Sequence, residues 1–149
     1  MKPTATSGSL LGWKGRDVWA ITPDASVFDA IAMMAERGIG ALLVIEGGKL
    51  AGIVSERDYT RKVFLQGRSS KQTSVQEIMT APVYVASPND SVEDAMRLMT
   101  ERRVRHLPIV EGERIVGVVS IGDLVKWTIS AQEEHIAQLH NFIAGSYPG

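Results

Sequence analysis

Two pairs of residues have the clearest chemical potential, each a serine followed three positions later by an aspartate: Ser55 with Asp58 and Ser120 with Asp123. Each serine directly follows an apolar run typical of a strand, and a helical pattern follows it, so each pair lies where a strand ends and a helix begins. Backbone N–H groups at such a helix start favour anions such as phosphate, and a serine hydroxyl adds a donor. The aspartate can accept hydrogen bonds from two vicinal hydroxyls, which is what a ribose offers.

The same spacing also has a purely structural interpretation. A serine with a carboxylate one turn later caps a helix and complements its dipole. Ser26 with Asp29, and Ser91 with Asp94, repeat this spacing at two other predicted helix starts, where we expect capping alone. For the pairs that follow a strand, the spacing leaves ligand binding and capping both open.

A basic stretch, RRVRH at positions 102–106, precedes the apolar run that begins with LPIV. We expect its first two arginines to form a solvated turn. Arg105 and His106 adjoin a predicted buried strand, where a cation needs an anionic partner, and phosphate is one. The unperturbed pKa of histidine is about 6.5, so phosphate binding at this point is expected to depend on pH.

The chain is an internal repeat. Shifted by 65 positions, Val18–Phe64 aligns without a gap on Val83–Ile129, and about 16 of roughly 47 aligned positions are identical. Each copy predicts a short strand, a proline turn, an amphipathic helix, a β-hairpin and a second helix. The fold class is therefore α+β, with two β-α-β-β-α units and a further C-terminal helix that continues to about Ile143.

Five segments follow from this pattern: an N-terminal segment (1–17), a first repeat (18–65), a polar linker (66–82), a second repeat (83–130) and a C-terminal helix and tail (131–149). Residues 1–12 are rich in Ser, Thr and Gly, and we expect them to be loose. Four methionines follow the apolar spacing of the first helices, which favours core packing over an adaptable binding surface: Met33, Met34, Met96 and Met99.

Composition excludes several functions. The 149 residues carry 16 Lys+Arg and 17 Asp+Glu, a net charge of −1 that argues against a nucleic-acid partner. The absence of cysteine removes disulfides and thiolate chemistry and fits a reducing compartment. No apolar run is long enough to predict a membrane span, so we expect a cytoplasmic protein. Neither a phosphate-loop motif nor a converging catalytic or metal-binding set is present, and no enzyme, catalytic residue or metal site is predicted.

At these motifs the sequence resembles tandem cystathionine-β-synthase (CBS) domain proteins, or Bateman modules, over roughly Val18–Ile129. The likeness rests on the doubled unit, the R-H-L-P-I-V stretch and the G-h-V-S-x-x-D motif at the second helix of each copy, where h is an apolar residue. It implies two repeats packed through their sheets with pseudo-two-fold symmetry, clefts for AMP, ADP, ATP, NAD or S-adenosylmethionine, and a homodimer. It implies no catalytic cofactor.

The resemblance also assigns roles to residues. Asp58 and Asp123 match the family's ribose-binding aspartates. Residues implied to approach phosphate or hydroxyl groups are Ser55, Ser120, Arg57, Arg105 and His106. Residues implied to form the adenine pocket, partly through their backbone, are Thr22, Ala41, Ser87 and Leu107.

Departures from the family pattern make the two sites unequal. The first repeat has Gly40 and Ala41 where the second has Arg105 and His106, and the second has Ile121-Gly122 where the first has Glu56-Arg57. The leading hypothesis is a regulatory module that binds an adenine nucleotide and signals to an effector protein. The alternative is a ligand-independent dimerisation or protein-interaction module, whose aspartates only cap helices.

Overall fold

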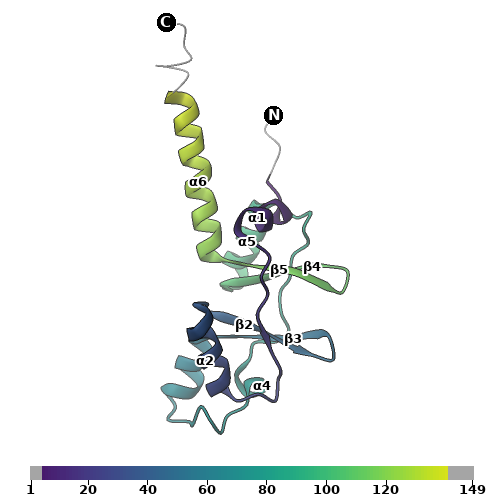
Figure 1. Cartoon of the computed structure of the whole chain (residues 1–149), viewed down its shortest axis with the longest axis vertical. Coiled ribbons are helices and arrows are strands. Elements are labelled where there is room, and N and C mark those ends of the chain that lie inside the picture. The colour runs from purple at the N-terminus through teal and green to yellow at the C-terminus, as the bar shows by residue number, and fades with distance from the viewer. Residues whose placement is uncertain (1–4, 141–149) are drawn as a thin grey trace, which may run out of the picture. The chain divides into compact units, whose positions relative to one another are not determined.

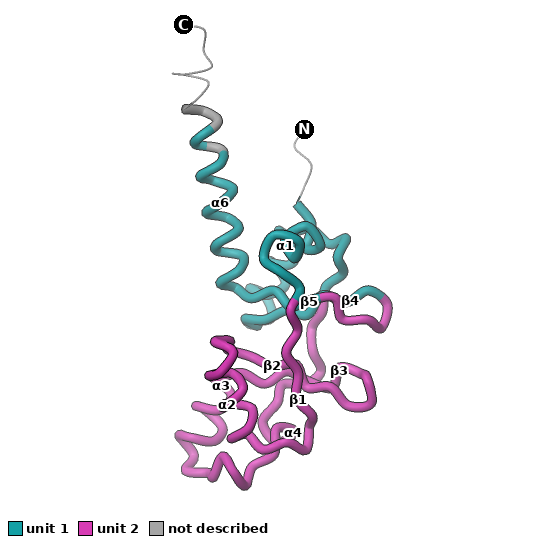
Figure 2. Tube along the Cα trace, viewed as in Figure 1, with its two compact units in different colours: residues 1–16, 86–111, 117–149 teal, residues 17–85, 112–116 magenta. Residues whose placement is uncertain are grey.

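The computed structural model describes residues 5–140, without the side chains of residues 135 and 138–140. The chain divides into two compact units, coloured separately in Figure 2. Unit 1 consists of residues 1–16, 86–111 and 117–149, and unit 2 consists of residues 17–85 and 112–116. The first repeat therefore falls in unit 2. Most of the second repeat falls in unit 1, together with the N-terminal segment.

Unit 2 contains a three-stranded sheet and its helices (Figure 1). In chain order its elements are β1 (Ala20–Ile21), α2 (Val27–Arg37), β2 (Ala41–Glu46), β3 (Lys49–Ser55), α3 (Glu56–Tyr59), the π-helical turn η1 (Thr60–Phe64) and α4 (Val75–Ile78). Strand β1 pairs parallel with β2, and β2 pairs antiparallel with β3. The hairpin turns at Gly47 and Gly48, whose φ angles of 59° and 78° are ones that glycine adopts without strain.

The core of unit 2 explains why these elements form. Ser26 caps α2 as predicted, since its Oγ accepts a hydrogen bond from the Asp29 N–H at 3.0 Å. The apolar face of α2 then packs against the sheet and against α4. The fully buried side chains of this core are Val27, Ala30, Met34, Leu42, Val44, Val54, Val63, Val75 and Ile78.

Unit 1 follows the same plan with two differences. Its elements are α1 (Ser7–Lys14), α5 (Val92–Arg102), β4 (His106–Glu111), β5 (Arg114–Ser120, of which residues 114–116 are counted with unit 2) and α6 (Ile121–His140). The counterpart of β1 is reduced to one parallel bridge between Ala86 and Ile109 beside the β4–β5 hairpin. The second helix of the repeat and the predicted C-terminal helix are one continuous helix, α6, up to His140. The predicted extension to Ile143 lies outside the described residues.

Each repeat is completed by the helix that precedes the other repeat in the chain. In unit 2, α4 docks beside the start of α2 through three backbone hydrogen bonds: Val75 N–H to Ala25 O at 2.8 Å, Gln76 N–H to Pro23 O at 2.9 Å, and Val27 N–H to Thr73 O at 2.8 Å. In unit 1, α1 makes the equivalent three beside α5: Ser7 N–H to Asp90 O at 2.7 Å, Gly8 N–H to Pro88 O at 2.9 Å, and Val92 N–H to Ala5 O at 2.9 Å.

A glycine in each hairpin permits the close approach of the segment docked beside it. A Cβ added at Gly52 in β3 would lie 2.6 Å from Met79 Sδ, directly after α4. A Cβ added at Gly117 in β5 would lie 2.6 Å from Leu11 Cδ2 in α1. The two glycines are 65 positions apart, so the repeat extends to the packing of α4 and α1.

The structure confirms the α+β class and the two hairpin repeats, but the expectation that residues 1–12 are loose is wrong for residues 7–12, which belong to α1. Thr6 and Ser9 form a reciprocal capping box, and Leu10 and Leu11 are fully buried. Their burial offsets the cost of ordering a helix that contains two glycines and two serines.

The methionine prediction is confirmed in part. Met34 and Met99 are 1% exposed and belong to the interior, as their spacing indicated. Met96 is 39% exposed, so the expectation of core packing is wrong there.

Candidate functional site

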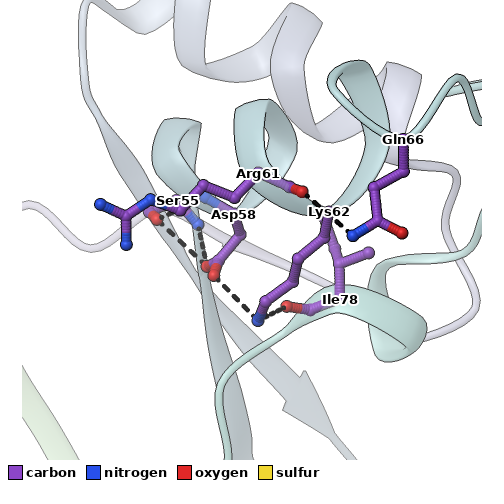
Figure 3. A network of polar contacts seen from close by, with 6 residues as sticks. All are labelled: Ser55, Asp58, Arg61, Lys62, Gln66 and Ile78. Carbon is purple, nitrogen blue, oxygen red and sulfur yellow. Dashed lines mark hydrogen bonds and ion pairs between the residues drawn. The ribbon is translucent and has the colours of Figure 1, made fainter.

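The first candidate site is the helix start at Ser55 and Asp58, where β3 runs into α3 (Figure 3). Asp58 Oδ2 accepts hydrogen bonds from the Ser55 N–H at 2.9 Å and from Ser55 Oγ at 3.1 Å. Ser55 Oγ in turn accepts one from the Asp58 N–H at 3.2 Å. The predicted capping arrangement is therefore present. It holds the carboxylate against the helix start with only 14% of its side chain exposed.

A lysine completes this first site. Lys62, one turn after Asp58, forms an ion pair with Asp58 Oδ1 at 3.1 Å and donates a hydrogen bond to the Ile78 carbonyl at 2.8 Å. Ile78 ends α4, so the ammonium joins the aspartate to the docked helix (Figure 3). The Lys62 side chain remains 43% exposed.

The second candidate site is the helix start at Ser120 and Asp123, where β5 runs into α6. Asp123 Oδ2 accepts a hydrogen bond from the Ser120 N–H at 2.8 Å, and Ser120 Oγ accepts one from the Asp123 N–H at 3.1 Å. Here the lysine comes from α1: Lys14 Nζ lies 2.6 Å from Asp123 Oδ2 and donates to the Val118 carbonyl at 2.6 Å. Both side chains of this pair are mostly buried, at 24% exposed for Lys14 and 19% for Asp123.

In unit 1, Lys14 affects the pKa values of both Asp123 and His106. Burial is the largest influence on the Asp123 carboxyl and raises its pKa, but the Lys14 ammonium and the Ser120 donors outweigh it, so the pKa lies below its ordinary value. Burial also lowers the pKa of His106, with Lys14 and Arg105 acting in the same direction and Asp123 opposing them. The predicted phosphate-facing histidine is therefore neutral at neutral pH.

Some predicted residues are brought to the two helix starts. Ala41 pairs with Ser55 in the sheet register, so it lies directly beside the first site. The Arg105 carbonyl accepts a hydrogen bond from the Ile121 N–H at 2.9 Å, which places the start of β4 beside the second site. The equivalent bond in unit 2 runs from the Glu56 N–H to the Gly40 carbonyl, so the first repeat has a glycine where the second has Arg105.

Other predicted residues are not brought to these helix starts. Thr22 lines a separate cavity of 360 Å³, formed with the β2–β3 turn and α4, whose lining includes neither Ser55 nor Asp58. Ser87 is engaged in its own turn, since its N–H donates to Asp90 Oδ2 at 2.8 Å. Leu107 is 0% exposed, so neither its side chain nor its backbone reaches the surface. The side chain of Arg57 is exposed to solvent. The adenine-pocket and Arg57 assignments stay predictions.

Two other kinds of feature are absent from the described residues. Among their side chains no group of three His, Asp or Glu is gathered as metal ligation requires. No helix in the described part of the chain has the length and apolar character to cross a bilayer.

Comparison with known proteins decides the family. The model for the CBS domain matches residues 15–64 and 75–130, which is most of the chain. The chain belongs to the CBS-domain family. The resemblance inferred from the motifs is thereby confirmed.

The chain is 41% identical over 138 residues to the mitochondrial CBS domain-containing protein CBSX3 of Arabidopsis thaliana, covering 89% of this chain and 66% of that protein. A structure of a protein with CBS domains from Burkholderia ambifaria MC40-6 matches with a TM-score of 0.82 at 52% identity, over 86% of this chain and 96% of that one. The fold is also that of the CBS domain pair of MJ0100, solved in complex with 5-methylthioadenosine and S-adenosyl-L-methionine, with a TM-score of 0.77 at 22% identity, over 87% of this chain and 99% of that one.

Sequence reasoning missed the two lysines that neutralise the CBS aspartates. Lys62 follows Asp58 at the i,i+4 spacing of helical ion pairs, and that spacing was a usable signal. Lys14 had no such signal, because its contact with Asp123 joins residues 109 positions apart. The capping pattern Thr6-x-x-Ser9 was the only local sign that a helix precedes Lys14.

Proposed function

We propose that this CBS-domain pair is a non-catalytic regulatory module that binds an adenine nucleotide (AMP, ADP, ATP or NAD) and passes its occupancy to an effector protein. The observation that carries the proposal is that Asp58 and Asp123 occupy equivalent helix starts, are only 14% and 19% exposed, and are each paired with a lysine. Helix starts favour phosphate, and a carboxylate has enough lone pairs for both hydroxyls of a ribose.

Burial separates these aspartates from those that only accompany a cap. Asp94, at the same position of α5, is 62% exposed and pairs with the equally exposed Arg97. A carboxylate held out of water stays ionised only when partners offset the free energy of its desolvation. A solvent-exposed capping carboxylate has no such cost. The burial of Asp58 and Asp123 supports a function beyond capping.

Thermal unfolding with AMP, ADP, ATP, NAD and S-adenosylmethionine tests the proposal. A true ligand at 100 times its Kd stabilises the protein by about 2.7 kcal/mol. We expect Asp58→Asn and Asp123→Asn each to reduce this shift, and Asp94→Asn, the matched control, to leave it unchanged. If none of these compounds moves the midpoint of the unmodified protein, the nucleotide-binding proposal is wrong.

The second candidate function is a ligand-independent dimerisation module, favoured by an apolar groove of 260 Å³ between α5 and α6. Val125 and Ile129 line it and are 51% and 49% exposed, and contiguous exposed apolar surface marks interaction sites. We expect a homodimer in sedimentation velocity that Val125→Asp with Ile129→Asp converts to monomer, while Lys126→Glu on the same helix does not. A monomeric unmodified protein would contradict this candidate.

The cellular location is part of the same proposal. The cysteine-free sequence fits a reducing compartment, for which we propose the cytoplasm. Fractionation of cells that express the tagged full chain checks it, and an organellar signal would contradict it.

A further inference from the structure

Lys14 holds the oxygen of Asp123 that a ribose would need. Asp123 Oδ2 accepts the Ser120 N–H at 2.8 Å and lies 2.6 Å from Lys14 Nζ. A carboxylate oxygen offers two lone pairs, so these two donors saturate Oδ2. A vicinal diol binds a carboxylate with one hydroxyl on each oxygen, and the second hydroxyl has no acceptor here until one donor withdraws.

Of the two donors, the ammonium is the one able to withdraw. The Ser120 N–H belongs to the backbone at the junction of β5 and α6, which is fixed by the hairpin and the helix. Lys14 reaches Asp123 through a flexible four-carbon side chain from the last residue of α1. Its helix stays anchored without this contact, because Leu10 and Leu11 are fully buried.

We propose that Lys14 is an intramolecular competitor of the nucleotide at Asp123: the ligand's ribose must displace the ammonium, and the last turn of α1 then loses its ties to both Asp123 and Val118. The inference rests on the proposed function. It makes α1 a regulatory element of the second site, one that lowers nucleotide affinity and responds to occupancy.

The competition is stronger at the second site than at the first. The Lys14–Asp123 pair is shorter than the Lys62–Asp58 pair, at 2.6 Å against 3.1 Å, and Lys14 is 24% exposed where Lys62 is 43% exposed. Water and salt screen the more buried pair less. Asp123 therefore holds Lys14 more tightly than Asp58 holds Lys62.

Calorimetric titration with AMP and with ATP tests the proposal in the full chain. An Asp58→Asn background removes the first site, and Lys14→Met is then introduced. We expect Lys14→Met to tighten binding about fivefold, the factor that corresponds to an ion pair of about 1 kcal/mol. Lys49→Met removes the same charge from an exposed position at the start of β3, and it should leave the affinity unchanged. Lys14→Gln is the second variant should Lys14→Met fail to fold.

The outcomes separate this inference from the proposed function. Unchanged or weaker nucleotide binding in both Lys14 variants overturns the proposal that Lys14 competes with the nucleotide. Lys14 would then either have no effect on affinity or itself contact the nucleotide. Binding by the unmodified chain but by no Asp58→Asn protein overturns it as well, while the proposed function survives at Asp58. Failure of every protein, the unmodified chain included, to bind either nucleotide overturns both.

Discussion

In both repeats a lysine joins the aspartate at the helix start to the docked helix, but the lysine belongs to the docked helix itself in only one of them. In the first repeat Lys62 extends from η1, pairs with Asp58 and reaches the last carbonyl of α4. In the second repeat the lysine belongs to the docked helix α1 itself and reaches back to Asp123. The position equivalent to Lys62 is Trp127, whose ring packs edge-on against Trp13 with centroids 5.5 Å apart.

The comparison teaches that the backbone plan constrains the fold more than the choice of side chain does. Both repeats keep a glycine under the docked segment, and both keep the aspartate at the helix start. The lysine that pairs with the aspartate comes from a different element in each repeat. A mostly buried carboxylate needs a cation, but any neighbouring element can supply it. The docked helix α1 carries the lysine that pairs with the aspartate, whereas α4 carries none. A change at Asp123 therefore acts directly on the docked helix, and a change at Asp58 acts on α4 only through Lys62.

The largest test of this equivalence removes the anchors of the docked helices. Leu10 in α1 and Ile78 in α4 correspond in the packing, and they are 0% and 1% exposed. We expect Leu10→Ala and Ile78→Ala each to lower the free energy of unfolding by about 2–5 kcal/mol, because each leaves a cavity in a packed core. Urea denaturation measures both.

The exposed Gln76 of α4 is the control, and Gln76→Ala should change stability by less than about 0.5 kcal/mol. If Leu10→Ala costs no more than this control, α1 is not part of the second repeat's core and the equivalence with α4 fails.

A smaller effect is expected at the two glycines. Gly52→Ala and Gly117→Ala each create overlap, at a cost of about 1–3 kcal/mol. The three atoms nearest to a Cβ at Gly117 are all side-chain atoms of Leu11, whereas a Cβ at Gly52 also lies 3.0 Å from the Thr80 carbonyl oxygen. Leu11→Ala should therefore remove most of the Gly117→Ala penalty. Met79→Ala should relieve Gly52→Ala less, because the backbone carbonyl remains.

Double-mutant cycles in urea denaturation give these two coupling energies. Equal relief at the two positions would show that the Thr80 carbonyl yields as easily as a side chain, and would remove this distinction between the repeats.

The sequence predicts what is encoded locally. The hairpin turns follow from Gly47-Gly48 and Gly112, and the starts of α2 and α5 from Ser26 and Ser91, because turn conformations and caps depend on neighbouring residues. The internal repeat then fixes the order of elements, and the matching motifs indicate the CBS family.

The remainder depends on contacts between distant residues. Helices α1 and α4 were both missed, the second within the predicted linker 66–82. They correspond at a shift of 68 rather than 65 positions, as the capping residues Thr6 and Ser74 show, so the gapless alignment did not reach them. The pairing of Lys14 with Asp123 could not be predicted, since it exists only once α1 has docked beside α5. Ligand occupancy of either site stays a prediction.

Between pH 7.5 and 5.5, a pH dependence of stability should arise from His106 of the second repeat. Burial lowers the pKa of His106 below 6.5, and the equivalent residue of the first repeat is Ala41. Between the two pKa values the unfolded chain binds more protons than the folded one, so this stabilisation is complete above about pH 6.5 and is lost as the pH falls toward the folded value. Urea unfolding between pH 7.5 and 5.5 should show this loss. His106→Gln should flatten it while His135 and His140 remain, and an unchanged slope in that variant would assign the effect elsewhere.

The smallest effect is expected where the repeats differ at the surface. Arg97 pairs with Asp94 at 3.0 Å across an i,i+3 spacing, both more than 60% exposed, whereas the first repeat has Ala32 at this position beside Asp29. We expect Arg97→Ala to lower the free energy of unfolding by about 0.5 kcal/mol or less, and Ala32→Arg to raise it by a similar amount, because water screens exposed pairs. Urea denaturation at low and high salt measures both, and salt should remove both effects. A loss above about 1 kcal/mol, or one that persists in high salt, would mean that Arg97 stabilises α5 through packing. Exposed charge would then distinguish the repeats as strongly as Lys14 and Lys62 do.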